Sequence, residues 1–171
     1  MSRHFPLGSL AGIVAMALVA CSDSNSPSTT AELSAVSPAP AATAVATSTT
    51  VTLTFDHPMM PGMEQYVDLH HGGVTGATVP MHCAWSPDQT TLTCTPTNPL
   101  APGSQHTIHV GGGMTDEHGD RVHMDQWTTH GGQWCTPQML GGSHDGHPVD
   151  MMGHGWEHQN HYGMLFTFTT A

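Results

Sequence analysis

The sequence has almost no positive charge. It contains no lysine and only two arginines, Arg3 and Arg121, against 13 acidic residues, for a formal net charge of −11. Charged residues make up 9% of the chain, far below the roughly 25% of an average globular protein. A chain with so few cations cannot neutralise phosphates, which excludes proteins that bind nucleic acid or anionic membrane surfaces by charge.

Long apolar runs are also scarce, with one exception near the start. The stretch from Leu7 to Ala20 is apolar over 14 residues and follows a short basic segment. It is too short to span a bilayer comfortably and has the length of a secretory signal peptide. Its end, Leu18-Val19-Ala20-Cys21, resembles the lipobox of bacterial lipoproteins, which implies cleavage after residue 20 and lipidation of Cys21. The alternative is an ordinary signal peptide in which Cys21 is incidental.

These features predict a location outside the cytoplasm. Ser22 after the cysteine resembles the lipoproteins retained at the outer membrane. We therefore expect a chain that crosses the inner membrane and is lipid-anchored at the cell envelope, facing the periplasm or the cell surface in an oxidising space. Residues 22–48 consist mainly of Ser, Thr, Ala and Pro, which predicts a disordered tether over 21–48 and a folded domain over 49–171.

Helical periodicity is absent, and the folded part shows the alternation of β-strands. Val51, Leu53 and Phe55 share one face of the first expected strand. The expected strands are 50–55, 66–69, 79–85, 91–95, 107–110 and 165–169. This pattern predicts an all-β fold, a β-sandwich with a long Gly/His/Met-rich loop before the last strand.

Several short motifs resemble the bacterial Ig-like domain named after the S-layer protein SbsA. Phe55-Asp56-His57-Pro58-Met59 resembles its F-x-x-P-M signature, and Phe166-Thr167-Phe168-Thr169-Thr170 resembles its closing strand. Further matches in the family's order are the stretches 91–96 and 100–103 and the turn 116–119. The resemblance implies a structural surface module without chemistry of its own. This chain departs from it by an insertion at about 122–161, so function must come from what has been added.

Three cysteines remain if Cys21 is lipidated. Cys83 and Cys94 lie symmetrically about the turn at Asp88-Gln89, so we expect them to face each other across a hairpin and form a disulfide. The alternative is a pair of small core residues that never bond. Cys135 is then a free thiol, a soft metal ligand or the site of an intermolecular bridge.

Histidine and methionine are the residues in excess. Residues 57–164 hold 14 of the 15 histidines and 10 of the 12 methionines. A thioether exposed in a glycine-rich loop gains little from packing but is a soft ligand, so thioether with imidazole indicates Cu(I), and imidazole alone indicates Cu(II), zinc or nickel. The candidate metal ligands are His57, Met60, Met63, Met114, His118, His123, Met124, His130, His144, His147, Met151, Met152, His154, His158 and His161.

Strand parity predicts which of these ligands meet. If the strands alternate in direction, the loop after Phe55 and the loop after Val110 emerge at the same end of the sandwich. The expected shared site is formed by His57, Met59, Met60 and Met63 from the first loop and Met114, His118, His123 and Met124 from the second. His70-His71 and Met81-His82 form a smaller donor group. His106 is in phase with Ile108 and is expected to point into the core, whereas His109 is expected to point outward.

The sequence contains one match to an enzyme motif, which we reject. His154-Gly155-Trp156-Glu157-His158 matches the H-x-x-E-H zinc-peptidase pattern, but that pattern needs a helix, and the surrounding glycines oppose one. A blue-copper centre is also disfavoured, because Cys135, His144 and Met151 are too widely spaced.

The sequence therefore predicts a non-catalytic envelope lipoprotein that sequesters or hands on copper. Its expected partners are the metal ion, the membrane through Cys21, and an envelope protein that the sequence does not identify. The alternative is a structural or adhesive Ig-like surface module whose histidines and methionines have no specific metal role. Acid would separate the ligand types, because protonation releases metal from imidazole but not from thioether.

Overall fold

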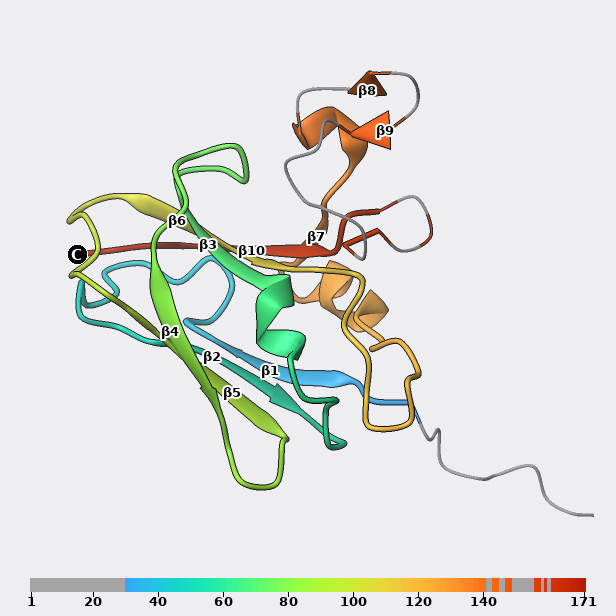
Figure 1. Cartoon of the computed structure of the whole chain (residues 1–171). Coiled ribbons are helices and arrows are strands. Elements are labelled where there is room, and N and C mark those ends of the chain that lie inside the picture. Colours follow the sequence, from blue (N-terminus) through green and yellow to red (C-terminus); the bar gives the residue numbers. More distant parts are fainter. Residues whose placement is uncertain (1–29, 141–142, 145–146, 149–155, 158, 160) are drawn as a thin grey trace, which may run out of the picture.

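The fold is an all-β sandwich, as the sequence predicts. The computed structural model describes residues 30–140, 143–144, 147–148, 156–157, 159 and 161–171. The first four-stranded sheet has the order β1-β2-β5-β4, with β1 Leu33–Ser37, β2 Val51–Phe55, β5 Thr91–Pro96 and β4 Met81–Trp85. The second has the order β3-β6-β10-β7, with β3 Val67–His71, β6 Gln105–Val110, β10 Met164–Thr169 and β7 Gln133–Trp134 (Figure 1). All pairings within both sheets are antiparallel.

Short elements complete the described part of the chain. Three 3-10 helices are η1 Met63–Tyr66, η2 Asp125–Thr129 and η3 Pro137–Leu140. Two strands of two residues each, β8 Ser143–His144 and β9 His147–Pro148, pair to form a small ribbon beyond η3 at one end of the molecule (Figure 1). Among the described residues, no helix has the length and apolar character needed to cross a bilayer.

The core lies between the two sheets and follows from their two-residue alternation. Val51, Leu53 and Phe55 are buried on the inner face of β2, and Phe166 and Phe168 are buried on the facing side of β10. Each such side chain contributes about 1.5–3 kcal/mol by leaving water. The hairpin β4–β5 carries the disulfide between Cys83 and Cys94, which pair directly across the two strands.

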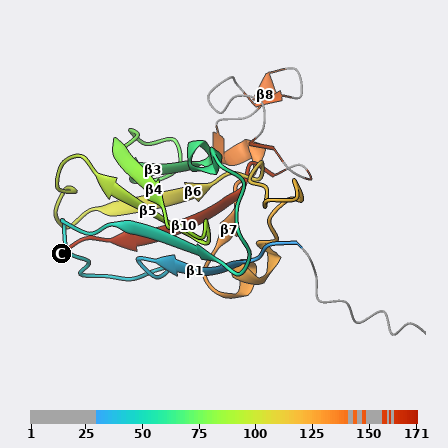
Figure 2. The same cartoon turned by 60° about the horizontal axis from the view of Figure 1, so that its bottom comes forward.

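The predicted tether was too long at its C-terminal end. Leu33–Ser37 forms the edge strand β1, antiparallel to β2, with Leu33 and Val36 buried in the core. The composition of 22–48 is poor in large side chains, but two apolar residues and backbone pairing with β2 suffice for an edge strand. Its outer side is covered by η2, whose Trp127 Nε1 and Gln126 Nε2 donate to Leu33 O at 2.6 and 3.1 Å (Figure 2). Cys21 and residues 22–29 lie outside the described residues.

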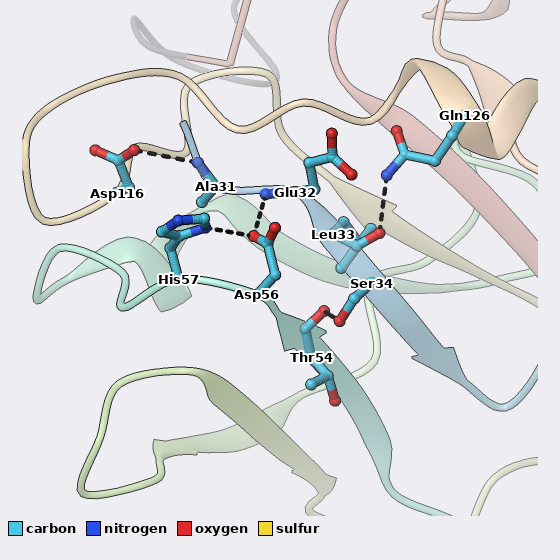
Figure 3. Close-up of polar contacts among 9 residues, drawn as sticks. All are labelled: Ala31, Glu32, Leu33, Ser34, Thr54, Asp56, His57, Asp116 and Gln126. Atoms are coloured by element: carbon cyan, nitrogen blue, oxygen red, sulfur yellow. Dashed lines mark hydrogen bonds and ion pairs between the residues drawn. The ribbon is translucent and has the colours of Figure 1, made fainter. Parts of the chain in front are cut away.

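Asp116 fastens the start of β1 to the loop that follows β6. Its carboxylate is fully buried and accepts the backbone N–H of Ala31 at 3.2 Å and those of His118 and Asp120 at 2.9 Å (Figure 3). Burial alone would raise the pKa of Asp116, but these N–H groups favour the ionised form and hold the pKa below its ordinary value. The nearby carboxylate of Asp56 likewise accepts a hydrogen bond from the backbone N–H of Glu32, at 2.6 Å.

The described part of the insertion at 122–161 contains regular elements and takes part in a second apolar cluster. It contributes β7 to the second sheet, and its Cys135, Leu140 and Trp156 pack with Val74, Tyr162 and Leu165 on that sheet's outer face. Trp156 lies over Gly111, where a Cβ would come within 2.6 Å of the indole. Leu140 and Trp156 thus supply apolar surface that covers part of this sheet, and the glycine-rich segment contributes to a second, smaller core.

We expect Leu33→Ala to destabilise the domain by about 2–5 kcal/mol, because it opens a cavity between β1 and the core. The exposed neighbour Ala35→Ser is the matched control and should change the free energy of unfolding little. Urea denaturation measures both. Equal stability of the two variants would mean that β1 does not belong to the folded core.

Asp116→Asn should cost about 1–3 kcal/mol at neutral pH, because its amide would face the N–H groups that the carboxylate now accepts. Since the folded pKa lies below the unfolded one, the stabilisation is present above the unfolded pKa and is lost as pH falls through the folded pKa. The difference between wild type and variant should therefore shrink in acid. A difference in urea-unfolding free energy that stays constant from neutral pH down to pH ~2 would contradict this role.

Candidate metal centre

The loops at 57–63 and 114–118 lie side by side, as strand parity predicts. Met59 and Asp116 form an isolated antiparallel bridge, Met60 N donates to Thr115 O at 3.1 Å, and Glu117 N donates to Pro58 O at 3.0 Å. The two donor-bearing loops thus form one junction at the end of the sandwich where β2 ends and β6 ends.

Two thioethers converge on Thr115 within this junction. Thr115 N donates to Met63 Sδ at 3.2 Å, and Thr115 Oγ1 lies 3.5 Å from Met63 Sδ and 3.9 Å from Met60 Sδ. Met60 is half-buried, whereas Met63 and Met114 are buried members of the main core. Packing therefore accounts for Met63 and Met114, and Met60 is the thioether of the three that solvent reaches best.

The imidazoles at the junction are open to solvent. His57 Nδ1 lies 2.8 Å from Asp56 Oδ1 (Figure 3), and this hydrogen bond raises the pKa of His57. The side chain of His118 is exposed, while its backbone N–H is held by Asp116. The His118 ring has no hydrogen bond among the described residues, whereas His57 keeps Nε2 free while its Nδ1 is bonded to Asp56.

A pocket of about 100 Å³ gathers three of the predicted ligands. It is lined by Val122, His123, Met124, Asp125, Trp134, Gln159 and His161. The chain enters the insertion at His123 and returns from it at His161, so residues far apart in the sequence meet here. Strand β1 fixes the first side of the pocket, because His123 N donates to Ala31 O at 2.8 Å and Leu33 N donates to His123 O at 3.2 Å.

His161 is the most constrained donor in this pocket. Its ring stacks on Trp134 with centroids 5.0 Å apart and an interplanar angle of 17°. Its Nδ1 is buried and has no hydrogen-bond partner among the residues that the structure describes. Met124 is buried beside it at 3% exposure, and His123 is exposed. The pocket is therefore lined by a thioether side chain and two imidazoles, one of which has a buried nitrogen without a partner among the described residues.

The other predicted ligands are not brought together. His130 is exposed on η2, and its Nδ1 lies 2.8 Å from Gln126 O. His144 and His147 are paired across the β8–β9 ribbon, but their side chains are outside the described part of the chain. Met151, Met152, His154 and His158 also lie outside it. Within the described ranges, no group of three or more His, Cys, Asp and Glu side chains has the arrangement of a metal site.

Two histidines outside the main set of candidate ligands are buried on the outer face of the second sheet, and one of them, His70, belongs to the predicted smaller donor group. His109 is 0% exposed and His70 is 4% exposed. The prediction that His109 points outward placed it on the correct face, since His106 and Ile108 face the core, but not in solvent. The aromatic cover supplied by Trp156, whose ring centroid lies 4.7 Å from that of His109, is the reason.

Cys135 is a free thiol buried in the outer cluster. Burial raises the pKa of Cys135 to about 11, so the group stays protonated at neutral pH. A buried, protonated thiol is a poor candidate for an intermolecular bridge.

Similarity to solved structures is distant. The S-layer protein SbsC is 20% identical with a TM-score of 0.41, and the match covers 55% of this chain and 12% of that one, so this chain spans about an eighth of it. CopC from Methylosinus trichosporium OB3b is 15% identical with a TM-score of 0.46, covering 82% of this chain and 92% of that one. PcoC, a methionine-rich copper resistance protein from Escherichia coli, is 14% identical with a TM-score of 0.44, covering 82% and 98%. None of these likenesses bears on what this chain binds.

No curated protein matches the sequence. A family model described as a bacterial Ig-like domain matches residues 27–130, which include β1 to β6 and the loop junction. This agrees with the motifs at 55–59 and 91–103 and with the observed sandwich. The chain belongs to the bacterial Ig-like domain family.

Proposed function

We propose that this protein is a lipid-anchored envelope protein that binds copper and sequesters it or hands it on, without catalysis. The observation that carries the proposal is the pocket of about 100 Å³ that Met124, His123 and His161 line together, with His161 Nδ1 buried and without a partner among the described residues. Anchoring through Cys21 and export to the envelope are part of the proposal and rest on the sequence of the first 21 residues.

Ligand chemistry favours copper over harder ions at this pocket. A thioether with imidazole nitrogens is a soft donor set that suits Cu(I), whereas zinc and nickel are served by imidazole alone. The pocket also includes Asp125, so a cation there gains a nearby carboxylate. Trp134 fixes the plane of His161, which reduces the entropy lost when that ring binds an ion.

The charge of the whole chain supports cation capture. A formal net charge of −11 with no lysine attracts cations and leaves no ammonium group to compete for the acidic residues. The exposed imidazoles His57 and His118 at the loop junction, with half-buried Met60, offer a second, open donor group. Such a group suits transfer to a partner better than long-term storage.

A structural or adhesive surface module is the second candidate. Membership of the bacterial Ig-like family favours it, because such a sandwich needs no metal to fold. If this second candidate is correct, metal binding does not depend on the insertion, and the histidines and methionines of the insertion serve packing and solvation alone.

Anaerobic titration of the full chain with Cu(I) against a chromophoric chelator tests the copper proposal. Met124→Leu keeps the volume of the side chain but removes the sulfur, and His161→Phe removes the unpaired nitrogen while keeping a ring on Trp134. Each should weaken the tightest Cu(I) equivalent by roughly tenfold or more. Met139→Leu, at a half-buried methionine on η3 outside the pocket, is the matched control.

Two results would contradict the proposal. One is no competition with the chelator by the wild-type protein. The other is equal affinity of Met124→Leu, His161→Phe and Met139→Leu, which would separate copper binding from the pocket. If a parallel titration shows that zinc binds more tightly than copper, the function becomes that of a metal buffer based on imidazole ligands.

A further inference from the structure

Two buried imidazoles lie together under the insertion, away from the pocket of His123 and His161. His70 on β3 and His109 on β6 share the outer face of the second sheet, where the two strands are neighbours (Figure 1). Their ring centroids are 6.2 Å apart, and their exposures are 4% and 0%. Histidine is an unusual choice for such a place, where an aliphatic residue would pack without any polar atom to satisfy.

Hydrogen bonds to backbone carbonyls fix the tautomer of each ring. His70 Nδ1 lies 3.2 Å from Gly76 O, and His109 Nε2 is bonded to Tyr162 O. A carbonyl oxygen only accepts, so these two nitrogens carry the protons. The lone pairs are therefore on His70 Nε2 and His109 Nδ1. This is the arrangement of metal-binding histidines, which donate their other N–H to a carbonyl or carboxylate.

Both lone-pair nitrogens are left without a partner. His70 Nε2 and His109 Nδ1 are buried, and neither has a hydrogen-bond partner among the described residues. An unsatisfied buried polar atom costs about 1–3 kcal/mol, so two adjacent ones are an expensive feature unless something binds them. Burial lowers the pKa of His109 to about 4, so protonation does not occupy its nitrogen at neutral pH.

The separation of the rings suits one ion held between them. A ring nitrogen lies about 1.1 Å from its ring centre and binds a transition metal at about 2.0 Å, so two rings on opposite sides of an ion have centres about 6.2 Å apart. A tetrahedral angle at the metal would reduce that separation to about 5.1 Å. The observed centroid separation of 6.2 Å equals that of the two-coordinate case, which requires His70 Nε2 and His109 Nδ1 to face each other across the ion. Cu(I), with its filled d shell, accepts two-coordination, whereas zinc favours four ligands.

We propose that His70 Nε2 and His109 Nδ1 form an internal two-imidazole site for Cu(I), covered by the insertion. Trp156 closes it above His109, and Tyr66 packs edge-on against Trp156 with centroids 5.9 Å apart. Asp68, paired across the strands with His109 and half-buried, supplies a negative charge on the same face. The site shares the copper chemistry of the proposed function but none of its residues.

Nitrogen-15 NMR of the histidine rings in the wild-type full chain tests the site without any substitution. The unprotonated nitrogens of His70 and His109 should shift on addition of Cu(I), or of Ag(I) as a redox-stable probe, while those of His106 should not. His106 is the internal control, since it is buried on the same strand but on the opposite face, with Nδ1 3.1 Å from Ser104 O.

Variants give the stoichiometry. His109→Leu and His70→Leu should each lose one Cu(I) equivalent, and His106→Leu should lose none, with folding checked by the dispersion of the backbone amide spectrum. If copper binds but the His70 and His109 resonances do not move, the internal site is refuted and the pocket proposal stands. If these resonances move equally in Met124→Leu and His161→Phe, the internal site is supported independently of the pocket.

Discussion

The buried carboxylate of Asp116 is the interaction on which the arrangement of the donors depends. By accepting the N–H of Ala31 it holds the start of β1 against the loop after β6. The same stretch of β1 then pairs with His123 through Ala31 O and Leu33 N. His123 and Met124 are in this way set at the entrance to the insertion, opposite His161 on its return. One carboxylate therefore connects an edge strand, a loop junction and the pocket that we assign to copper.

The insertion turns an ordinary sandwich into a three-layered arrangement over part of its surface. In a two-sheet sandwich the outer face of β6 is in contact with water, and alternate residues there are polar. Here both faces of β6 are buried from His106 onward. Gly111 makes room for Trp156, and Gly163, at φ +95°, brings the returning chain so close to Val110 that a Cβ would not fit. Polar residues on that face, His70 and His109 among them, are consequently enclosed rather than solvated.

Sequence reasoning succeeded where local pattern decides the outcome. The alternation of polar and apolar residues predicted the strands from Val51 to Val110 and the last strand. The turn at Asp88 predicted that Cys83 lies opposite Cys94. Strand parity predicted that the loop of Pro58 and Met60 lies beside the loop of Thr115 and Glu117. It failed where distant segments decide. Leu33 and Val36 look like part of a disordered spacer until β2 and Trp127 supply partners, and His109 looks exposed until Trp156 covers it. Met63 and Met114 were predicted as metal ligands but are buried in the core. Sequence does not separate the two cases, because a methionine that packs and one that binds metal have the same sequence signature.

The central claim is that thioether and imidazole bind copper together. X-ray absorption at the copper edge, measured on the wild-type protein loaded with Cu(I), tests it most directly. The pocket of Met124 with His123 and His161 requires sulfur scatterers in the first shell of the metal, and the imidazoles require nitrogen scatterers with the outer-ring pattern of histidine. We expect both at one equivalent of copper. A first shell made only of nitrogen or oxygen, in the wild type and unchanged in Met124→Leu, would contradict thioether ligation and with it the assignment of this pocket to copper.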